Sequence, residues 1–516
     1  MKALAKFNTT DASPEKMLLD PLVSLQVAID HHTKADTPLG SASSRSSIAS
    51  VCFLPTLRGS FHSNTGDDDA DSRTSFSSSS SSDDEGVQFR CRGMLMAESQ
   101  SASDITRSAR QAAAATHLLS GRYIASCHAN GECNLWDLGQ GQLARTESNH
   151  LVKNRGPGWM LRRVKEKTRD EGGSHFLYQT RDNRGTVSIH AWDHAGQFEE
   201  AATISSFSTY SQTFCAATPC TGSSNLVALP SANESKVTVR DWRVDSSSNP
   251  IAVFDAASAS AEEDSDVFDS TNPRKHGMLT SLAFSQSGNT QMQSTMNHCN
   301  SSHPIIACGM ESGTVFFHDL RMLGKHTETS FKLSNDPVLA LDLAPSHPNR
   351  SMVTSSPETS LTCGVIAVAG MAGENVAQQE MAAKDQGTVA ILKATFPASL
   401  ADHTNSSRLR LRSRLTTCQT NGEGKPGVSL CRFQPGDGRL FAVAGWDHRV
   451  RIFDRAAPAH AKNKKTKADP LAILRGHTDS VRTMDWAPDS ATTGLCATAA
   501  ADGQIKIWRC FSRSTE

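Results

Sequence analysis

Hydrophobic and polar residues alternate in short runs along this chain, and turn residues separate the runs. Near the C-terminus, SVRTMDW (480–486) alternates in this way, and the small-residue run LCATAA (495–500) follows it. Asp502–Gly503 then precedes a second alternating run, QIKIW (504–508). A period of two is typical of half-buried β-strands, and an Asp-Gly pair between two such runs predicts a tight hairpin. This segment therefore predicts a group of consecutive β-strands.

Weaker copies of the same unit occur upstream. Some of these copies have two apolar runs joined by a polar turn, and others keep a single strand-like run. The copies are RYIASCHANGECNLWDL (122–138), RGTVSIHAWD (184–193), SKVTVRDWR (235–243), PIIACGMESGTVFFHDLR (304–321), residues 365–392 and GRLFAVAGWDHRVRIFD (438–454). Together with the C-terminal unit they make seven copies of one structural repeat.

The spacing within the last copy indicates the architecture. His477 and Trp508 are 31 residues apart, as expected for a four-stranded propeller blade. The unit resembles a WD40 repeat, although Arg509 replaces the Asp of the Trp-Asp pair. The sequence therefore predicts an all-β fold, a seven-bladed WD40 β-propeller spanning residues 21–511. Blades are expected to end near residues 138, 193, 243, 321, 392, 454 and 509.

The copies are too far apart for compact blades. Trp136 to Trp508 is 372 residues over six steps, or 62 per step, against roughly 40–45 in a compact blade. The excess falls in polar segments that cannot bury enough apolar surface to become ordered. We expect disorder in residues 1–20, in a Ser/Asp-rich insertion (61–115), in an acidic insertion (256–275) and in a basic insertion (456–469).

Two further runs are assigned to outer strands. The last copy lacks an outer strand of its own, and an open edge would invite mispairing. LVSLQVAI (22–29) is therefore predicted to close the last blade. RLRLRSRL (408–415) alternates strictly, which predicts an outer strand with Leu facing inward and Arg facing solvent.

Composition narrows the class of protein. The chain has 516 residues with 52 basic and 53 acidic side chains, a balance that gives no bulk attraction to nucleic acid or to an anionic membrane. Its 13 cysteines include no CxxC pair, and several lie in apolar runs, which suits a reducing compartment. No apolar run approaches the ~20 residues that span a bilayer. We expect a soluble, intracellular protein that binds neither membrane nor small-molecule substrate, and we expect no direct binding to nucleic acid.

The stretch AGWDHRVRIFD (444–454) contains the residues that are the best candidates for catalysis, metal binding or partner binding. Asp447 lies at the turn between two strands and is interpreted as structural, because no second acid or nucleophile is patterned near it. Trp446 either packs beneath a neighbouring blade or serves as an exposed anchor for a partner. Metal binding by His448 is not favoured, because no second His or Cys lies at the spacing of a metal ligand. Trp446, His448 and Arg449 form the candidate interaction surface, and we predict no catalytic, cofactor or metal site.

Resemblance to WD40 blades also implies a buried polar network in the last copy. In such blades a His, a turn Asp, a hydroxyl residue and a Trp are joined by hydrogen bonds, and here these are His477, Asp502, Thr498 and Trp508. The Asp holds the imidazole, the imidazole contacts the hydroxyl, and the hydroxyl accepts from the indole. Each buried polar group then has a partner, as burial requires.

A narrower resemblance rests on GRLFAVAGWDHRVRIF, LAILRGHTDSVRTMDWAPD and ADGQIKIW. These segments resemble the last two blades of the ASTRA-associated WD-repeat family, also called guanine nucleotide-binding protein β-subunit-like proteins. The resemblance implies a non-enzymatic scaffold in the nucleus, possessing no cofactor, whose partners are subunits of an ASTRA-like complex linked to chromatin remodelling. It also implies contact with the cochaperone that matures phosphatidylinositol-3-kinase-like kinases.

Two other classes of protein fit the sequence pattern less well. A G-protein β-like signalling subunit would carry an N-terminal heptad helix, but Pro14 and Pro21 interrupt that region here. Another WD40 adaptor remains as an alternative of the same kind. A propeller enzyme would need clustered acids or His ligands around its axis, and the sequence pattern indicates none.

Overall fold

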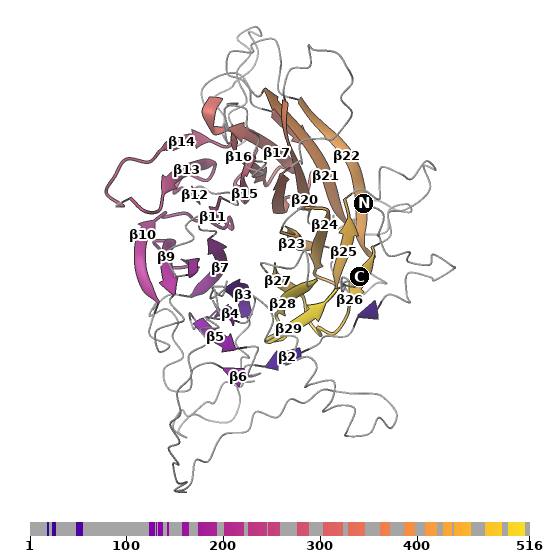
Figure 1. The fold of residues 1–516 in the computed structure, drawn as a ribbon. Coiled ribbons are helices and arrows are strands. Elements are labelled where there is room, and N and C mark those ends of the chain that lie inside the picture. Colours follow the sequence, from indigo (N-terminus) through magenta and orange to yellow (C-terminus); the bar gives the residue numbers. More distant parts are fainter. Residues whose placement is uncertain are drawn as a thin grey trace, which may run out of the picture.

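The computed structural model is an all-β, seven-bladed β-propeller, in which seven sheets surround a common centre (Figure 1). The structure describes residues 18–19, 23–26, 48–54, 123–129, 131, 133–137, 142–143, 157–164, 174–192, 201–220, 225–244, 246–257, 276–287, 303–322, 329–345, 362–371, 386–397, 408–419, 427–435, 438–455, 470–487 and 494–510. The predicted insertions 61–115 and 456–469 lie outside these residues, as does most of 256–275.

The first four blades each have four strands and follow one another along the chain. Blade 1 has β3 (Ile48–Leu54), β4 (Tyr123–His128), β5 (Cys133–Asp137) and β6 (Gln142–Leu143). Blade 2 has β7 (Gly158–Val164), β8 (Ser174–Thr180), β9 (Thr186–Trp192) and β10 (Ala202–Ser208). Blade 3 has β11 (Thr218–Pro219), β12 (Leu226–Pro230), β13 (Lys236–Asp241) and β14 (Ala252–Asp255). Blade 4 has β15 (Leu279–Ser287), β16 (His303–Met310), β17 (Thr314–Asp319) and β18 (Thr329–Lys332), with the short 3₁₀ helix η3 (Leu320–Met322) after β17.

The last three blades complete the ring. Blade 5 has β19 (Val338–Pro345), β20 (Thr362–Met371), β21 (Gln386–Pro397) and β22 (Arg408–Gln419). Blade 6 has β23 (Val428–Phe433), β24 (Leu440–Gly445), β25 (Val450–Asp454), β26 (Ala472–Leu474) and, at its outer edge, β1 (Leu18–Leu19). Blade 7 has β27 (Val481–Trp486), β28 (Leu495–Ala500) and β29 (Gln504–Arg509), with β2 (Val23–Gln26) as its outer strand.

The hydrophobic core is divided among the blade interfaces. Among the residues that the structure describes, seven clusters of buried side chains each join two adjacent blades. The cluster containing Ile48 and Phe53 of β3 together with Ile505 and Ile507 of β29 joins the first blade to the last. Both faces of every sheet are thus covered by neighbours, which explains why most strands are apolar at nearly every position rather than at alternate ones.

Six of the inner strands share one irregularity. The register of β3, β7, β15, β19, β23 and β27 shifts by one residue after the first pair with the second strand. Such a β-bulge increases the local twist and redirects the side chains that follow. The fifth residue of each of these strands therefore occupies an equivalent place in its blade.

The N-terminal segment is attached to the last two blades. In β2, Val23 and Leu25 pair with Ile507 and Ile505 of β29 in an antiparallel register. β1 pairs in parallel with β26 of the preceding blade, and this pairing lies within residues 1–20, which the sequence pattern leaves unstructured. The pair Leu18–Leu19 is too short to carry a periodic signal, and only the edge of β26 gives it a partner.

The strictly alternating run becomes the outer strand β22 of blade 5. Leu409 and Leu411 are half-buried against the interface with blade 4, and Leu415 is buried, while Arg410 and Arg412 are exposed. The predicted orientation of this strand is confirmed. Within the described residues, no helix has the length and hydrophobicity needed to cross a bilayer.

Removing the N-terminal strands should weaken ring closure in two steps. Deletion of residues 1–21 removes β1 and should lower the melting temperature slightly, since β26 keeps β25 as a partner. Deletion of residues 1–30 also removes β2, exposes the edge of β29, and should lower the melting temperature by roughly 5 °C or more. Scanning calorimetry of both truncations checks this; equal melting temperatures for all three chains would contradict the closing role of β2.

Candidate functional site

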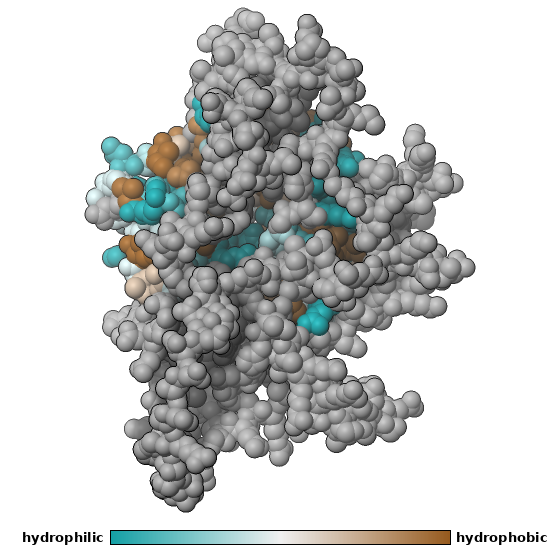
Figure 2. All heavy atoms as spheres, viewed as in Figure 1, coloured by the Kyte–Doolittle hydropathy of each residue, from teal (hydrophilic) through white to brown (hydrophobic). Residues whose placement is uncertain are grey.

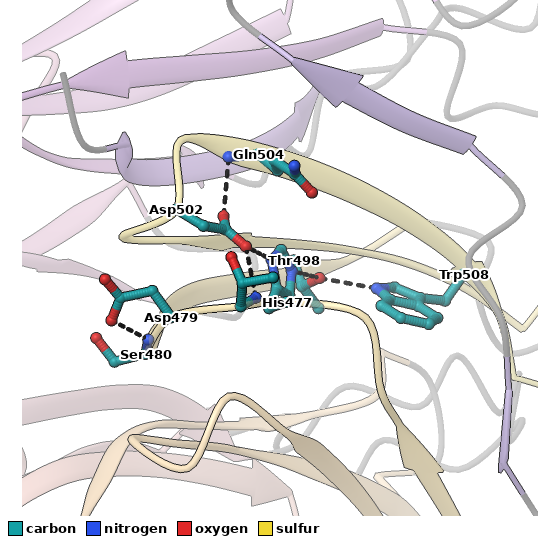
Figure 3. A network of polar contacts seen from close by, with 8 residues as sticks. His477, Asp479, Ser480, Thr498, Asp502, Gln504 and Trp508 are labelled. Carbon is teal, nitrogen blue, oxygen red and sulfur yellow. Dashed lines mark hydrogen bonds and ion pairs between the residues drawn. The ribbon is translucent and has the colours of Figure 1, made fainter. Parts of the chain in front are cut away.

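The structure brings His477, Thr498, Asp502 and Trp508 together in blade 7 (Figure 3). His477 Nδ1 lies 3.0 Å from Asp502 Oδ2, and His477 Nε2 lies 2.8 Å from Thr498 Oγ1. The indole Nε1–H of Trp508 donates to Thr498 Oγ1 at 2.7 Å. Asp502 also accepts from the backbone N–H groups of Thr478 and Gln504. The carboxylate thus joins the entry to β27 with the turn between β28 and β29.

These hydrogen bonds determine which nitrogen of His477 carries the proton. Thr498 accepts from the indole, so its own hydrogen is available for His477 Nε2, and Nδ1 then carries the proton donated to Asp502. Burial lowers the pKa of His477 and outweighs the opposing effect of Asp502, so the imidazole is neutral at neutral pH. The pKa of Asp502 is also lowered, because the hydrogen bond to His477 and two backbone N–H groups outweigh burial. The network is a structural one, in which every group is engaged with another.

Asp447 of blade 6 lies at the place that Asp502 has in blade 7, but it has a different partner. Phe453 replaces the Trp and Val443 replaces the Thr, so no hydroxyl or indole is present to complete a network. Arg451 instead donates to both carboxylate oxygens, at 3.1 Å from Nη1 and 2.6 Å from Nη2. The pair is largely buried, and a bidentate pair of this kind fixes the turn.

The turn that carries Asp447 also places its neighbours. Trp446 is half-buried against Gly427, just before β23 of its own blade, and a Cβ atom at residue 427 would approach the indole to 2.5 Å. Its backbone N–H donates to the Gly427 carbonyl at 3.1 Å. His448 is exposed, and Arg449 is half-buried. The indole of Trp446 therefore packs against its own blade at Gly427.

His448 has a backbone conformation that residues with a side chain rarely adopt. Its φ is +64°, and the equivalent residues in the turns of four other blades are Gly131, Gly185, Gly313 and Gly503, with φ of 93°, 56°, 81° and 75°. Glycine adopts this region without strain, whereas a side chain makes it costly. Glycine is therefore favoured at this turn position, but blade 6 has His448, with an exposed imidazole, in its place.

Charged residues from four blades gather around the centre of the ring, and the sequence pattern did not reveal them. They occupy the fifth position of their inner strands: Arg162, Asp342, Arg432 and Asp485. Burial lowers the pKa of Arg162 to about 9; the positive charge of Arg432 adds to this, while Asp342 and Asp485 oppose it. The one available signal was a charge within an apolar run, as in LALDLAP and SLCRF.

The bonds of these residues run from blade to blade. Asp342 of blade 5 accepts from the Phe433 N–H of blade 6 at 2.7 Å. Asp485 of blade 7 accepts from the Phe53 N–H of blade 1 at 2.9 Å, and Arg162 of blade 2 donates to Thr218 of blade 3 at 2.5 Å. These charges therefore tie adjacent inner strands together. In the described part of the chain, no group of three or more His, Cys, Asp or Glu side chains is arranged to hold a metal ion.

Comparison with known proteins identifies the repeat. The family described as "WD domain, G-beta repeat" matches residues 468–509, which contain the network of blade 7. The mouse guanine nucleotide-binding protein subunit beta-like protein 1 is 35% identical over 86 residues, covering 17% of this chain and 22% of that protein. Protein transport protein sec13 of Aspergillus oryzae is 35% identical over 86 residues, covering 16% of this chain and 26% of that protein. The chain thus spans about a quarter of the length of these relatives.

Solved structures with a similar arrangement are also propellers. The C-terminal WD40 domain of Sif2 is 13% identical with a TM-score of 0.39, covering 75% of this chain and 78% of that one. The β-propeller domain of Cps50 (Swd1) from Myceliophteria thermophila is 14% identical with a TM-score of 0.44, covering 75% and 93%. The chain is thus a seven-bladed β-propeller in which residues 468–509 match the WD40 repeat.

Breaking the network of blade 7 should destabilise the protein. His477→Ala or Asp502→Ala should each cost about 1–3 kcal/mol, because a buried polar partner is left unsatisfied. The free energy of unfolding in urea measures this, with Asp479→Ala as a control. Asp479 is exposed and, among the described residues, accepts only from the adjacent Ser480 N–H. A His477→Ala chain as stable as the control would contradict the structural role.

The same network predicts a pH effect. Because the pKa of His477 is lowered on folding, the unfolded chain binds the extra proton first, and stability falls as the pH drops below the ordinary value of 6.5. The urea midpoint of the wild type should therefore fall more steeply between pH 7 and pH 5 than that of His477→Ala. Parallel slopes would show that His477 does not titrate as described.

Proposed function

We propose that this chain is a non-enzymatic scaffold subunit of a nuclear, ASTRA-like complex, where it takes part in chromatin remodelling and in the maturation of phosphatidylinositol-3-kinase-like kinases. Support comes from the resemblance of its last two blades to the ASTRA-associated family and from the 35% identity over 86 residues with the mouse subunit beta-like protein 1. The partners are protein subunits of that complex and the kinase cochaperone. Neither a membrane nor a nucleic acid is a direct ligand in this proposal.

The observation that carries the proposal is the strained, exposed turn of blade 6. A residue held at positive φ costs of order 1 kcal/mol or more, and it persists where the surrounding structure fixes it, often at a binding site. His448 is held in this way between Asp447, which is anchored by Arg451, and the Gly445 N–H, which donates to the Arg449 carbonyl at 2.9 Å. The imidazole is therefore presented to solvent by a rigid turn.

The neighbours of His448 suit a contact with another protein. Trp446 offers the part of its indole that Gly427 does not cover, and a half-buried Trp supplies a large contact area with little loss of side-chain entropy. We propose Trp446, His448 and Arg449 as the surface through which the scaffold binds its partner subunit. Catalysis is not needed for this role.

Replacing His448 by glycine should separate stability from binding. His448→Gly relieves the positive φ and should leave the free energy of unfolding unchanged or raise it by up to about 1 kcal/mol. Purification of the tagged chain from its cells, followed by quantitative mass spectrometry, should recover about tenfold less of the partner subunits. His448→Asn, which tolerates the same φ but lacks the imidazole, should behave likewise.

The control is Ala501→Gly, a glycine placed in the equivalent turn of blade 7. It should recover the partners in full. Equal recovery by wild type and His448→Gly would contradict the assignment of this surface. Recovery of a Gγ-like peptide with the wild-type chain would favour the signalling subunit instead, and recovery of protein-transport subunits would favour a role like that named for the sec13 relatives. Recovery of the ASTRA-like subunits and cochaperone would support the proposal.

A further inference from the structure

Exposed apolar side chains are concentrated on one sector of the ring. Seven large hydrophobic residues are exposed in the described part of the chain, and six of them belong to blades 2 and 3 or to the loop between these blades. These six are Ile204, Tyr210, Phe214, Val244, Ile251 and Val253. Figure 2 shows brown side chains on this side of the molecule, where Figure 1 places β10, β13 and β14. Such a concentration commonly marks a surface that binds another protein.

Two of these residues lie on the loop from β10 to β11. In this loop, the hydroxyl of every second residue accepts a hydrogen bond from the backbone N–H two residues later. Thr209 Oγ1 accepts from the Ser211 N–H, Ser211 Oγ accepts from the Thr213 N–H, and Thr213 Oγ1 accepts from the Cys215 N–H. The intervening residues Tyr210, Gln212 and Phe214 are all exposed. The two aromatic rings, 55% and 57% exposed, are therefore held in water by a loop that is already ordered.

The loop is docked onto the turn between β8 and β9. The Tyr210 N–H donates to the Arg184 carbonyl at 2.7 Å, and Thr209 Oγ1 donates to the Gly185 carbonyl at 2.8 Å. A Cβ atom at Gly185 would lie 2.6 Å from Thr209 Oγ1, so the contact requires glycine there. Tyr210 has φ of +52°, and in the described part of the chain only His448 shares this feature among non-glycine residues. The docking thus holds a strained tyrosine at the surface.

Arg181 joins this loop to the inner strand of blade 2. Its guanidinium carbon lies 4.6 Å from the ring centroid of Phe214 and 5.9 Å from that of Trp159. Trp159 is half-buried near the start of β7, and the Arg181 N–H donates to the Pro157 carbonyl at 2.8 Å. A guanidinium stacked on aromatic faces keeps its edge N–H groups free to bind a carboxylate.

The surface around Tyr210 and Phe214 carries the positive charges of Arg181 and Arg184. Asp182, the nearest acid in the turn, is occupied: it accepts from the Thr180 hydroxyl at 3.1 Å and from the Thr186 N–H at 3.2 Å. Arg181 and Arg184 are exposed, and among the described residues neither has a carboxylate within ion-pair distance. Within the described part of the chain, the aromatic–arginine surface, defined as Trp159, Arg181, Arg184, Tyr210 and Phe214, therefore has no ion-paired carboxylate.

We propose that the aromatic–arginine surface binds a short acidic segment of a partner protein, in which a carboxylate side chain lies next to a bulky apolar one. The carboxylate pairs with Arg181 and Arg184, and the apolar side chain packs against Tyr210 and Phe214. This surface lies on blade 2, apart from the turn of blade 6, so its test is independent of the function proposed above. Aromatic and Arg residues are those most often found at the energetic centre of protein interfaces.

A single-stranded nucleic acid would also stack on aromatic rings, but the surroundings favour a peptide. Non-specific binding to nucleic acid rests on several phosphate contacts along a basic surface. Here only two exposed arginines accompany the rings, and the adjoining outer strands add apolar residues such as Ile204 and Val253 rather than cations. Apolar surface of this kind gains free energy against another protein, not against a phosphate backbone.

The test uses a phage library that displays random 12-residue peptides, selected against the purified full-length chain. Enriched peptides should combine Asp or Glu with an aromatic or large aliphatic residue. A fluorescein-labelled enriched peptide should bind the wild type in a polarisation assay, and Arg181→Glu or Phe214→Ala should each weaken binding about tenfold or more. Arg482→Glu, the same charge change at an exposed residue of blade 7, should have no effect.

Tyr210→Gly distinguishes a binding residue from a structural one. This variant removes the positive-φ strain, so its melting temperature should not fall, while its affinity for the peptide should drop about tenfold. The proposal is overturned if no peptide is enriched, if the enriched peptides lack acidic residues, or if Arg181→Glu binds them as well as Arg482→Glu does. It is also overturned if a single-stranded oligonucleotide binds the wild type more tightly than the peptide does and loses binding in Arg181→Glu.

Discussion

Burial between blades is the constraint on which the whole structure depends. Each sheet has two apolar faces, and only its two neighbours can cover them, so the seven hydrophobic clusters exist only if the ring is closed. The interface between blades 1 and 7 joins residues from opposite ends of the chain, and Asp485 bonds to Phe53 across 432 residues of sequence. Closing that interface costs chain entropy, which the apolar area buried there must offset.

Closure also explains where the polar groups of the interior are found. Because both faces of a sheet are apolar, a buried charge needs a polar partner, and on the inner strands that partner belongs to the next blade, as when Asp342 accepts from the Phe433 N–H. In blade 7 the network of His477, Thr498, Asp502 and Trp508 holds the inner strand to the two strands beyond it. These polar contacts fix the relative position of strands that hydrophobic contact alone would leave free to slide.

The ring constrains the conformation of its turns and loops less than that of its strands. The two non-glycine residues with positive φ in the described part of the chain lie in these turns and loops. His448 and Tyr210 have positive φ, are exposed, and lie on the face formed by the turns and by the loops between blades. Since the framework is stable through its blade interfaces, it can hold such conformations at little risk to the fold. This arrangement suits a scaffold that binds more than one partner at separate places on the same face.

The sequence by itself determined the repeat, the strand periodicity and the residues of the blade 7 network, because these depend on short-range patterns within one blade. It also placed the outer strand β22, whose alternation of Leu and Arg is complete within eight residues. Only the tertiary structure decided that Arg162, Asp342, Arg432 and Asp485 lie around one centre, that β1 pairs with β26, and that Arg181 stacks on Phe214. Each of these contacts joins separate blades or distant segments, and no local pattern records which residues ring closure will bring together.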